Sequence, residues 1–341
     1  MRVLHLLASP VFSGPAENVA LLAATQRALG CEVSIAVDRK RPFLEAEEPI
    51  VPRLEAMGLL DRGELELSVK STPAAWVSDA RGLRARNVDV VHAHFSHDHF
   101  LARWALAGKL KRVALIRSLH APRSLRWSLP FAHGYTVPSS RYRFHLPDRR
   151  VAVLRARIDP AFQPPSDLGA LRRALRLEGS PLVGMVSTFK PSRRHLVGLE
   201  AFAQLRIARP TARLVLVGDG ITEPATRRRV AELNLEEAVT FAGYRSGPDF
   251  IQWLQALDCI WVLGLGNDWS ARAAAQARAC GVAVLGVDQG ALPEWSSAIV
   301  EPEPSSIVEA TISPQIELAP KPDFPNDDGL LDFYRSVATV S

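Results

Sequence analysis

The sequence predicts an α/β protein with two Rossmann-like domains, each built on a doubly wound parallel sheet. Short β-branched runs alternate with amphipathic helical stretches, which is the pattern of parallel strands joined by crossover helices. This alternation breaks once, at Arg155–Asp167, where prolines cluster, and then restarts. The chain has 341 residues, whereas a single hydrophobic core stops growing at roughly 250–300 residues. We therefore expect one domain over residues 1–157 and a second over residues 158–325.

The first domain is expected to contain four buried strands and four helices. The strands are predicted from short β-branched, apolar runs at Val3–Leu7, Val33–Val37, Val88–His92 and Val113–Arg117. Helical periodicity predicts the helices at Pro15–Leu29, Pro49–Met57, His97–Gly108 and within residues 74–86.

The second domain repeats the alternation. Strands are predicted at Leu182–Ser187, Arg213–Val217, Val239–Phe241, Cys259–Leu263 and Val282–Leu285, with helices at Arg193–Ala208, Pro224–Leu233, Ala271–Ala279 and Ser305–Thr311. A Pro-rich connection then leads to a last helical segment, Leu330–Val340. We expect residues 326–341 to return to the first domain and to dock there through Leu331, Phe333 and Tyr334.

Composition indicates a soluble globular protein, with 47% hydrophobic and 23% charged residues. No run approaches the ~18 apolar residues of a membrane span. The N-terminal segment predicts a first strand rather than a signal peptide, because an amphipathic helix follows it directly. The three cysteines lack metal-site spacing and are odd in number, which is typical of a reducing cytoplasm.

Arginine dominates the positive charge of this chain. The net charge is +5, and only six of the 41 basic residues are lysine. Arginine binds phosphate through two parallel hydrogen bonds, so an anionic ligand is one explanation for the excess; a GC-rich genome is another. Nucleic acid is not predicted as a partner, because the arginines are scattered and no recognition motif accompanies them.

Residues 258–294 contain the most informative motif. They predict a strand, a polar loop, a helix of small residues, a Cys-Gly stop, a second strand and a Gly-Ala-Leu-Pro-Glu turn. This layout resembles the donor-sugar site of retaining, family 4-like glycosyltransferases (glycosyl transferases group 1). The resemblance covers residues 1 to about 294 and implies the GT-B fold, in which two Rossmann-like domains face each other across a cleft. The first domain would then hold the acceptor, and the second the nucleotide-sugar donor.

The resemblance implies functional residues in this loop and helix. Two glutamates eight residues apart contact the transferred sugar and the ribose in that family, and here Asp268 and Gln276 stand at those positions. Ser270 is expected to cap the helix, whose free N–H groups would stabilise a diphosphate, with Arg272 adding donors. Ser270 could instead cap an ordinary packing helix. Trp269 stands where relatives often have glycine.

A second element of the resemblance is MVSTFKPSRRHL, where the family clamps the diphosphate with an arginine and, five residues later, a lysine. Thr188 falls on the first position and Arg193 on the second. Lys190 or Arg194 could replace the missing charge, or could simply be solvated. Arg193 is expected to stabilise the departing diphosphate.

Three glycine turns add candidates for donor binding. Gly218 and Gly220 follow a strand, at the end where open α/β sheets bind ligands. Tyr244 follows the next strand, where it would either stack on the base or pack in the core. Gly14 lies in the first turn of the chain beside Pro15, although relatives often have two consecutive glycines there.

A string of histidines, from His92 to His99, ends the third predicted strand. Alternate histidines on a strand share a face, so a zinc site is one interpretation. Ser96, however, occupies the position where a metallo-β-lactamase-type pattern requires Asp. The resemblance instead implies that His94 or His97 contacts the donor sugar. His120, after the next strand, is an acceptor-side candidate, and a purely structural role remains an alternative for all three.

The resemblance thus implies a metal-independent, retaining glycosyltransferase. It would move a sugar from a nucleotide diphosphate sugar to a cell-envelope glycan or glycolipid, without a cofactor and in the cytoplasm. The absence of an Asp-x-Asp motif agrees with metal independence. The basic stretch Lys109–Arg112 would either contact the inner face of the membrane or be a solvated surface. The substitutions at Pro15, Thr188, Trp269 and Gln276 leave an alternative, a catalytically degenerate scaffold with a binding or assembly role.

Overall fold

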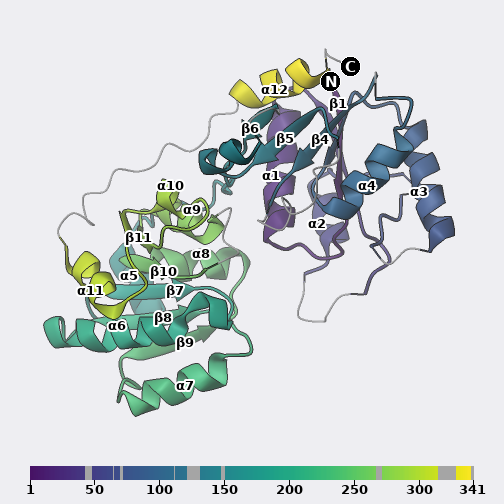
Figure 1. The fold of residues 1–341 in the computed structure, drawn as a ribbon. Helices are drawn as coiled ribbons and strands as arrows, with labels where there is room; N and C mark the ends of the chain where they lie inside the picture. The colour runs from purple at the N-terminus through teal and green to yellow at the C-terminus, as the bar shows by residue number, and fades with distance from the viewer. Residues whose placement is uncertain are drawn as a thin grey trace. The chain divides into compact units, whose positions relative to one another are not determined.

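The computed structural model describes residues 1–42, 48–63, 65–69, 72–110, 112–120, 131–146, 150–265, 271–313 and 328–338. The chain divides into two compact units: unit 1 comprises Met1–Arg157 and Phe324–Ser341, and unit 2 comprises Ile158–Asp323. Each contains a six-stranded, fully parallel sheet with flanking helices, which confirms the predicted α/β class (Figure 1). Among the described residues, no helix has the length and apolarity needed to cross a bilayer.

The sheet of unit 1 has the strand order β2-β1-β3-β4-β5-β6. Its strands are β1 (Arg2–Leu7), β2 (Glu32–Val37), β3 (Val90–Ala93), β4 (Ala114–Ser118), β5 (Gly134–Val137) and β6 (Val151–Val153). Its helices are α1 (Gly14–Ala28), α2 (Ile50–Ala56), α3 (Pro73–Ala85), α4 (Ser96–Ala105), the 3₁₀ helix η2 (Ser140–His145) and α12 (Asp328–Ala338). The strand that follows β1 in the chain, β2, lies on one side of β1, and the later strands are added on the other side. The switch point of this sheet is therefore between β1 and β3.

Helices cover both faces of this sheet. Helix α1 packs its small residues Ala16, Ala20 and Ala23 against β1 and β2, so that the helix axis lies close to the strands. Helices α3 and α4 pack side by side on the opposite face (Figure 1).

Helix α12 brings the C-terminal segment onto the same face of the sheet as α1. Leu330, Tyr334 and Val337 are buried there, at i, i+4 and i+7 on one side of the helix. A Cβ on Gly134 would lie 2.7 Å from Phe333, so glycine in β5 allows this close packing. The buried face is therefore centred on Tyr334 and includes Leu330, whereas Leu331 is only half-buried.

The sheet of unit 2 has the strand order β12-β11-β10-β7-β8-β9. Its strands are β7 (Leu182–Val186), β8 (Arg213–Val217), β9 (Val239–Gly243), β10 (Cys259–Val262), β11 (Ala283–Gly286) and β12 (Ala298–Ile299). Its helices are α5 (Leu168–Ala174), η3 (Pro191–Arg193), α6 (His195–Ala208), α7 (Glu223–Glu232), α8 (Gly247–Gln255), α9 (Arg272–Ala279), α10 (Leu292–Trp295) and α11 (Pro304–Ile312). This order matches the arrangement typical of dinucleotide-binding sheets, with its switch point between β7 and β10.

Two predicted helix starts were wrong. The helix expected from Arg193 begins at His195, because Arg194 adopts a left-handed conformation with φ 58° and separates η3 from α6. The helix expected to be capped by Ser270 begins at Arg272, and its N-cap is Ala271 with φ 48°.

Candidate functional site

The candidate site of unit 2 lies at the switch point of its sheet. Strands β7 and β10 are neighbours, and the loops at their carboxyl ends leave the sheet side by side. Open α/β sheets bind ligands in the crevice at such a point, because the two loops diverge toward opposite faces. Both loops that the sequence nominated for donor binding, residues 187–194 and the loop that starts at Leu263, are therefore at this one place.

Arg193 connects the two loops. A Cβ on Gly264 would lie 2.9 Å from Nη1 and 3.1 Å from Cδ of Arg193, so the arginine side chain crosses directly over this glycine. The backbone N–H of Leu265 also donates to the carbonyl of Ser192 over 2.9 Å. A side chain at position 264 would displace the Arg193 side chain, so glycine here leaves room for a guanidinium group at the start of the β10–α9 loop.

Gly218 and Gly220 position the loop after β8 against the loop after β7. A Cβ on Gly218 would lie 2.2 Å from the carbonyl oxygen of Ser187, and one on Gly220 would lie 2.6 Å from that of Phe189. Their φ angles of 136° and 143° also favour glycine. The N–H of Phe189 donates to the carbonyl of Asp219 over 2.7 Å. These glycines serve close backbone packing around the site.

His195 lies directly beneath this loop. Its ring stacks on Phe189 with the centroids 4.2 Å apart, and its Nε2 lies 3.3 Å from the hydroxyl oxygen of Ser187. Burial, with a smaller contribution from the charge of Arg193, lowers the pKa of His195 to about 4. The ring is therefore neutral at pH 7 and adds no positive charge beside Arg193.

The remaining unit 2 candidates differ in exposure. Lys190 is exposed, and the side chain of Tyr244 points largely into solvent, being 63% exposed. Gln276 is buried on α9, and Arg272 is half-buried in the first turn of that helix. Asp268, Trp269 and Ser270 lie outside the described residues.

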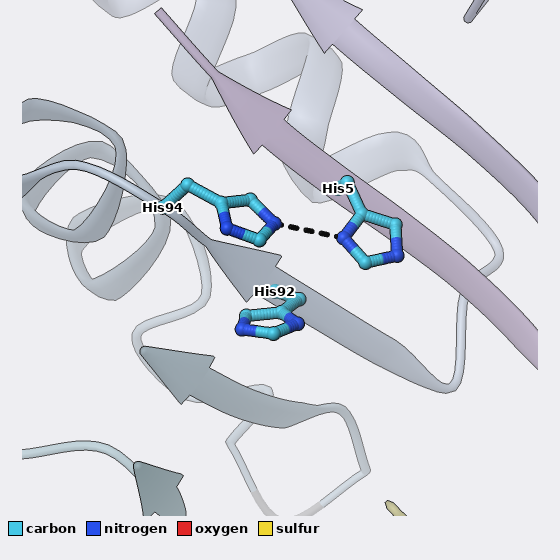
Figure 2. Close-up of side chains that lie close together, drawn as sticks. All are labelled: His5, His92 and His94. Atoms are coloured by element: carbon cyan, nitrogen blue, oxygen red, sulfur yellow. Dashed lines mark hydrogen bonds between the residues drawn. The ribbon is translucent and has the colours of Figure 1, made fainter. Parts of the chain in front are cut away.

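In unit 1, Gly14 is the first residue of α1. The central feature of this unit is a cluster of buried histidines. Figure 2 shows His5 on β1 facing His94 just beyond β3, with His92 below both rings. The Nδ1 of His5 lies 2.9 Å from the Nε2 of His94, and the Nε2 of His5 lies 2.7 Å from the Oε1 of Gln26. At its other side, the Nδ1 of His94 lies 3.4 Å from the Nε2 of His120. His120 is a half-buried residue and ends this series of hydrogen bonds.

His92 belongs to a second set of contacts. Its Nδ1 bonds the hydroxyl of Tyr334 on α12, and its Nε2 lies 2.8 Å from the hydroxyl oxygen of Ser118. Ser118 in turn lies 2.8 Å from the hydroxyl oxygen of Thr136. Both ring nitrogens of His92 therefore have protein partners.

His97, which was nominated with His94 as a contact of the donor sugar, lies elsewhere. It is in the first turn of α4, where its Nδ1 is 3.7 Å from a carboxylate oxygen of Asp98. Asp98 accepts hydrogen bonds from the backbone N–H groups of Ala8 and Phe95 and so ties the loop after β1 to the start of α4. The structure does not bring His97 into the histidine chain.

One ring nitrogen from each of His5, His92 and His94 lies within 4.8 Å of the others, a spacing that suits a metal ion. The donor set fits a cation poorly. Both ring nitrogens of all three histidines already bond protein groups, and no carboxylate takes part in these bonds. A divalent cation would have to displace these bonds and remain uncompensated in a buried position.

Sequence reasoning did not nominate His5, Gln26, Ser118 or Tyr334 as members of the cluster. His5 alone gave a usable signal, since a histidine interrupts an otherwise apolar strand. The contribution of Gln26 depends on which face of α1 meets the sheet, and that of Tyr334 depends on a contact between segments 242 residues apart.

Two family models match this chain, one in each unit. "Glycosyltransferase Family 4" matches residues 12–159, and "Glycosyl transferases group 1" matches residues 180–313. The chain belongs to the family 4-like glycosyltransferases with the GT-B fold, as the sequence motifs predicted.

Two curated relatives are similar over part of their length. A D-inositol 3-phosphate glycosyltransferase of Stackebrandtia nassauensis is 33% identical over 43% of this chain and 35% of its own length. An N-acetyl-alpha-D-glucosaminyl L-malate synthase of Bacillus anthracis is 23% identical over 61% of this chain and 58% of its own. The matches thus span about a third to three-fifths of these relatives.

Solved structures show the same fold at low identity. The Anabaena protein HepE, in complex with UDP and glucose, superposes with a TM-score of 0.73 at 18% identity and covers 99% of this chain and 98% of its own. A glycosyltransferase from Rickettsia africae has a TM-score of 0.69 at 16% identity over 99% of this chain and 92% of its own.

Proposed function

We propose that this protein is a retaining, metal-independent glycosyltransferase that transfers a sugar from a nucleotide diphosphate sugar to a cell-envelope glycan or glycolipid. The observation that carries the proposal is the position of Arg193, whose guanidinium group lies over Gly264 where the two switch-point loops meet. HepE, a protein of the same fold, binds UDP and glucose, which supports a nucleotide-sugar donor.

The chemistry requires positive charge where the diphosphate departs. Arg193 supplies a permanently charged group with paired donors, and the N-terminal end of α9 adds backbone N–H groups. With these groups the departing diphosphate is stabilised without a metal ion or another cofactor. In this proposal Asp268 contacts the transferred sugar. Gln276 contacts the ribose, and Arg272 contacts the diphosphate. In unit 1, His120 is proposed to contact a hydroxyl of the acceptor, because His94 has both ring nitrogens engaged.

Calorimetric titration of the full chain with UDP, GDP and ADP, without metal, tests the proposal. We expect one nucleotide to bind with a micromolar Kd. Absence of binding by all three at millimolar concentration would contradict a functional donor site.

The alternative, a degenerate scaffold, has two observations in its favour. Thr188, at the position of the missing arginine, is exposed and uncharged, and Gln276 is buried and uncharged. A double change of Thr188→Arg and Trp269→Gly separates the two ideas. If this variant binds a nucleotide that the wild type does not, the scaffold reading is supported; equal binding by both proteins favours the transferase.

A membrane-bound acceptor is supported by the outer face of α3 and α4. Phe100 and Trp104 are 57% and 52% exposed, although both are large and apolar, and the ring of Trp76 packs against Trp104 at a tilted angle with the ring centroids 4.7 Å apart. The exposed charges on these helices and the following turn are basic: Arg81, Arg84, Arg103 and Arg112. The two acidic residues of α3 and α4, Asp79 and Asp98, are buried.

Aromatic rings beside arginines fit the interface of an anionic bilayer, where rings enter the headgroup region and cations meet lipid phosphates. Sedimentation with phosphatidylserine vesicles should retain the wild type and lose most of a Phe100→Ser, Trp104→Ser double variant. Ile207→Ser, which removes an apolar side chain that is 85% exposed on α6, is the matched control and should bind normally. Equal binding by all three proteins, or by none, would contradict the membrane contact.

A further inference from the structure

A layer of buried polar side chains crosses the sheet of unit 1 beneath α1 and α12. His5 of β1, His92 of β3, Ser118 of β4 and Thr136 of β5 all point to this one face, and all four are at most 5% exposed. Gln26 from α1 and Tyr334 from α12 cover the layer. A buried polar group is costly unless it is hydrogen-bonded, so the directions of these bonds are tightly constrained.

The rings of the chain Gln26–His5–His94–His120 are neutral. Burial lowers the pKa of His5 and of His120 to about 4. The pKa of His94 also falls well below its usual value, because of burial first and the neighbouring histidines second. A neutral imidazole has one N–H donor and one bare nitrogen that accepts. Each hydrogen bond in the chain therefore fixes the tautomer of the next ring.

The direction of the chain starts at Gln26. Its Oε1 can only accept, so the Nε2 of His5 carries the hydrogen and the Nδ1 of His5 is bare. The bare Nδ1 requires His94 to donate from Nε2, which leaves the Nδ1 of His94 bare. His120 must then donate from its own Nε2. The result is a bare Nδ1 on His120, the ring at the end of the series.

We propose that Gln26 and His5 are positioning residues that act through His94 to hold His120 in one tautomer, with Nδ1 as a hydrogen-bond acceptor. This step rests on the proposed function in one respect: the group that Nδ1 accepts from is a hydroxyl of the acceptor. Gln26 lies two rings away from His120 and acts only through the intervening hydrogen bonds.

Long-range ¹H–¹⁵N correlation NMR of the full chain, labelled with ¹⁵N-histidine, reads the tautomer of each ring directly. In the wild type at pH 7 we expect His5, His94 and His120 all to carry hydrogen on Nε2. Hydrogen on Nδ1 of His120 in the wild type would overturn the proposal without any variant.

Two substitutions of Gln26 test its control over His120. Gln26→Met removes the acceptor with little change in volume, and we expect the tautomer ratio of His120 to shift roughly two- to tenfold, the equivalent of one neutral hydrogen bond. Gln26→Glu places a carboxylate beside His5 that favours the charged ring, whose Nδ1 then donates to His94, so this variant should reverse the tautomer of His120. Ser118→Ala is the matched control, since it removes a buried hydrogen-bond partner of His92 and Thr136, neither of which belongs to the series from Gln26 to His120. A merely structural role for Gln26 predicts lower melting temperatures with an unchanged His120 ratio, and that result would contradict the proposal.

The same samples separate this inference from the proposed function. UDP is expected to bind unit 2, so Gln26→Met should leave its Kd unchanged while the tautomer of His120 changes. Loss of UDP binding in the wild type would contradict the donor site alone. Stoichiometric zinc in the purified protein, with direct ligation of His5 and His94, would contradict the tautomer chain alone.

Discussion

The switch points of the two sheets are built in different ways. In unit 2, backbone segments approach one another through glycines, and one arginine side chain crosses between the loops. In unit 1, the elements around β1 and β3 are joined by buried polar side chains that hydrogen-bond one another, from Gln26 to His120 and from Tyr334 to Thr136. The comparison teaches that the spacing of glycines in the sequence can indicate where backbone segments meet. A network of buried side chains can be predicted only when it is known which face of each helix and strand points toward the others.

The largest effect is expected from Gly218→Ala. The new Cβ would lie 2.2 Å from a backbone oxygen that cannot move freely, at a φ of 136°. Backbone strain and overpacking together should cost about 3–5 kcal/mol of unfolding free energy. Gly243→Ala is the control, because its φ is 72° but nothing lies within 4 Å of the new Cβ; strain alone should cost about 1–2 kcal/mol. Similar losses in denaturant titrations of the two variants would contradict the packing role of Gly218.

Arg193→Gln should weaken nucleotide binding with little change in stability. Loss of charge-assisted hydrogen bonds to phosphate corresponds to about 2–3 kcal/mol, or roughly 30- to 150-fold in Kd. Arg228→Gln, on the exposed surface of α7, is a control for net charge and should change Kd less than twofold. Calorimetry on both variants makes the comparison, and equal Kd values would exclude Arg193 from the donor site.

Mild acid should open unit 1 before unit 2. Of the four described histidines whose pKa is lowered to about 4, His5, His99 and His120 lie in unit 1 and only His195 lies in unit 2. Their ordinary pKa is about 6.5. The unfolded state therefore takes up more protons between pH 6.5 and 4, so stability is complete above about pH 6.5 and falls as the pH drops through this window. Each such histidine contributes up to about 1.4 kcal/mol per pH unit.

Hydrogen exchange at pH 7.5 and pH 5, corrected for the intrinsic rate, measures this difference. We expect β1 and β3 to lose protection while β7 and β8 keep theirs. Earlier loss of protection in β7 and β8 would contradict the claim that buried neutral histidines make unit 1 less stable in acid than unit 2.

Tyr334→Phe should have a small effect on stability. It removes the hydroxyl that bonds His92 but keeps the buried ring of α12, so we expect a loss of about 1–2 kcal/mol from one unsatisfied buried nitrogen. Thermal unfolding should show a lower melting temperature for Tyr334→Phe. Ser336→Ala, on the exposed side of α12, should leave the melting temperature unchanged. Equal melting temperatures for Tyr334→Phe and the wild type would show that this bond contributes nothing to holding α12.

Much of the fold could be predicted because its strands are short apolar runs. Strand β8 was predicted with its observed bounds, and β1, β2 and β7 within one residue at each end. Strands β5 and β6 were missed, since GYTV and VAV are too short to show a period. Helix α8 was missed although it is amphipathic, because Gly247 and Pro248 at its start suggest a turn as much as a first helical turn.

The residues of the candidate site also differ in whether the sequence could place them. Arg193, Gly218 and Gly220 could be placed beside the switch point from the sequence, because motif spacing fixes them relative to strand ends. His97 was grouped with His94 by adjacency in sequence, but the chain turns into α4 at Ser96, so the two side chains diverge. Gln26 and Tyr334 could not be found, because nothing in a single sequence shows which residues of α1 and α12 cover His5 and His92.

Hydrogen exchange of the full chain with and without the nucleotide that binds tests the central claim most directly. We predict slower exchange at the amides of residues 187–194 and 263–265 in unit 2, and unchanged exchange in Arg2–Leu7 and Val90–Ala93 of unit 1. Slowing confined to those two strands, with none at residues 187–194, would place the nucleotide in unit 1 and contradict the account.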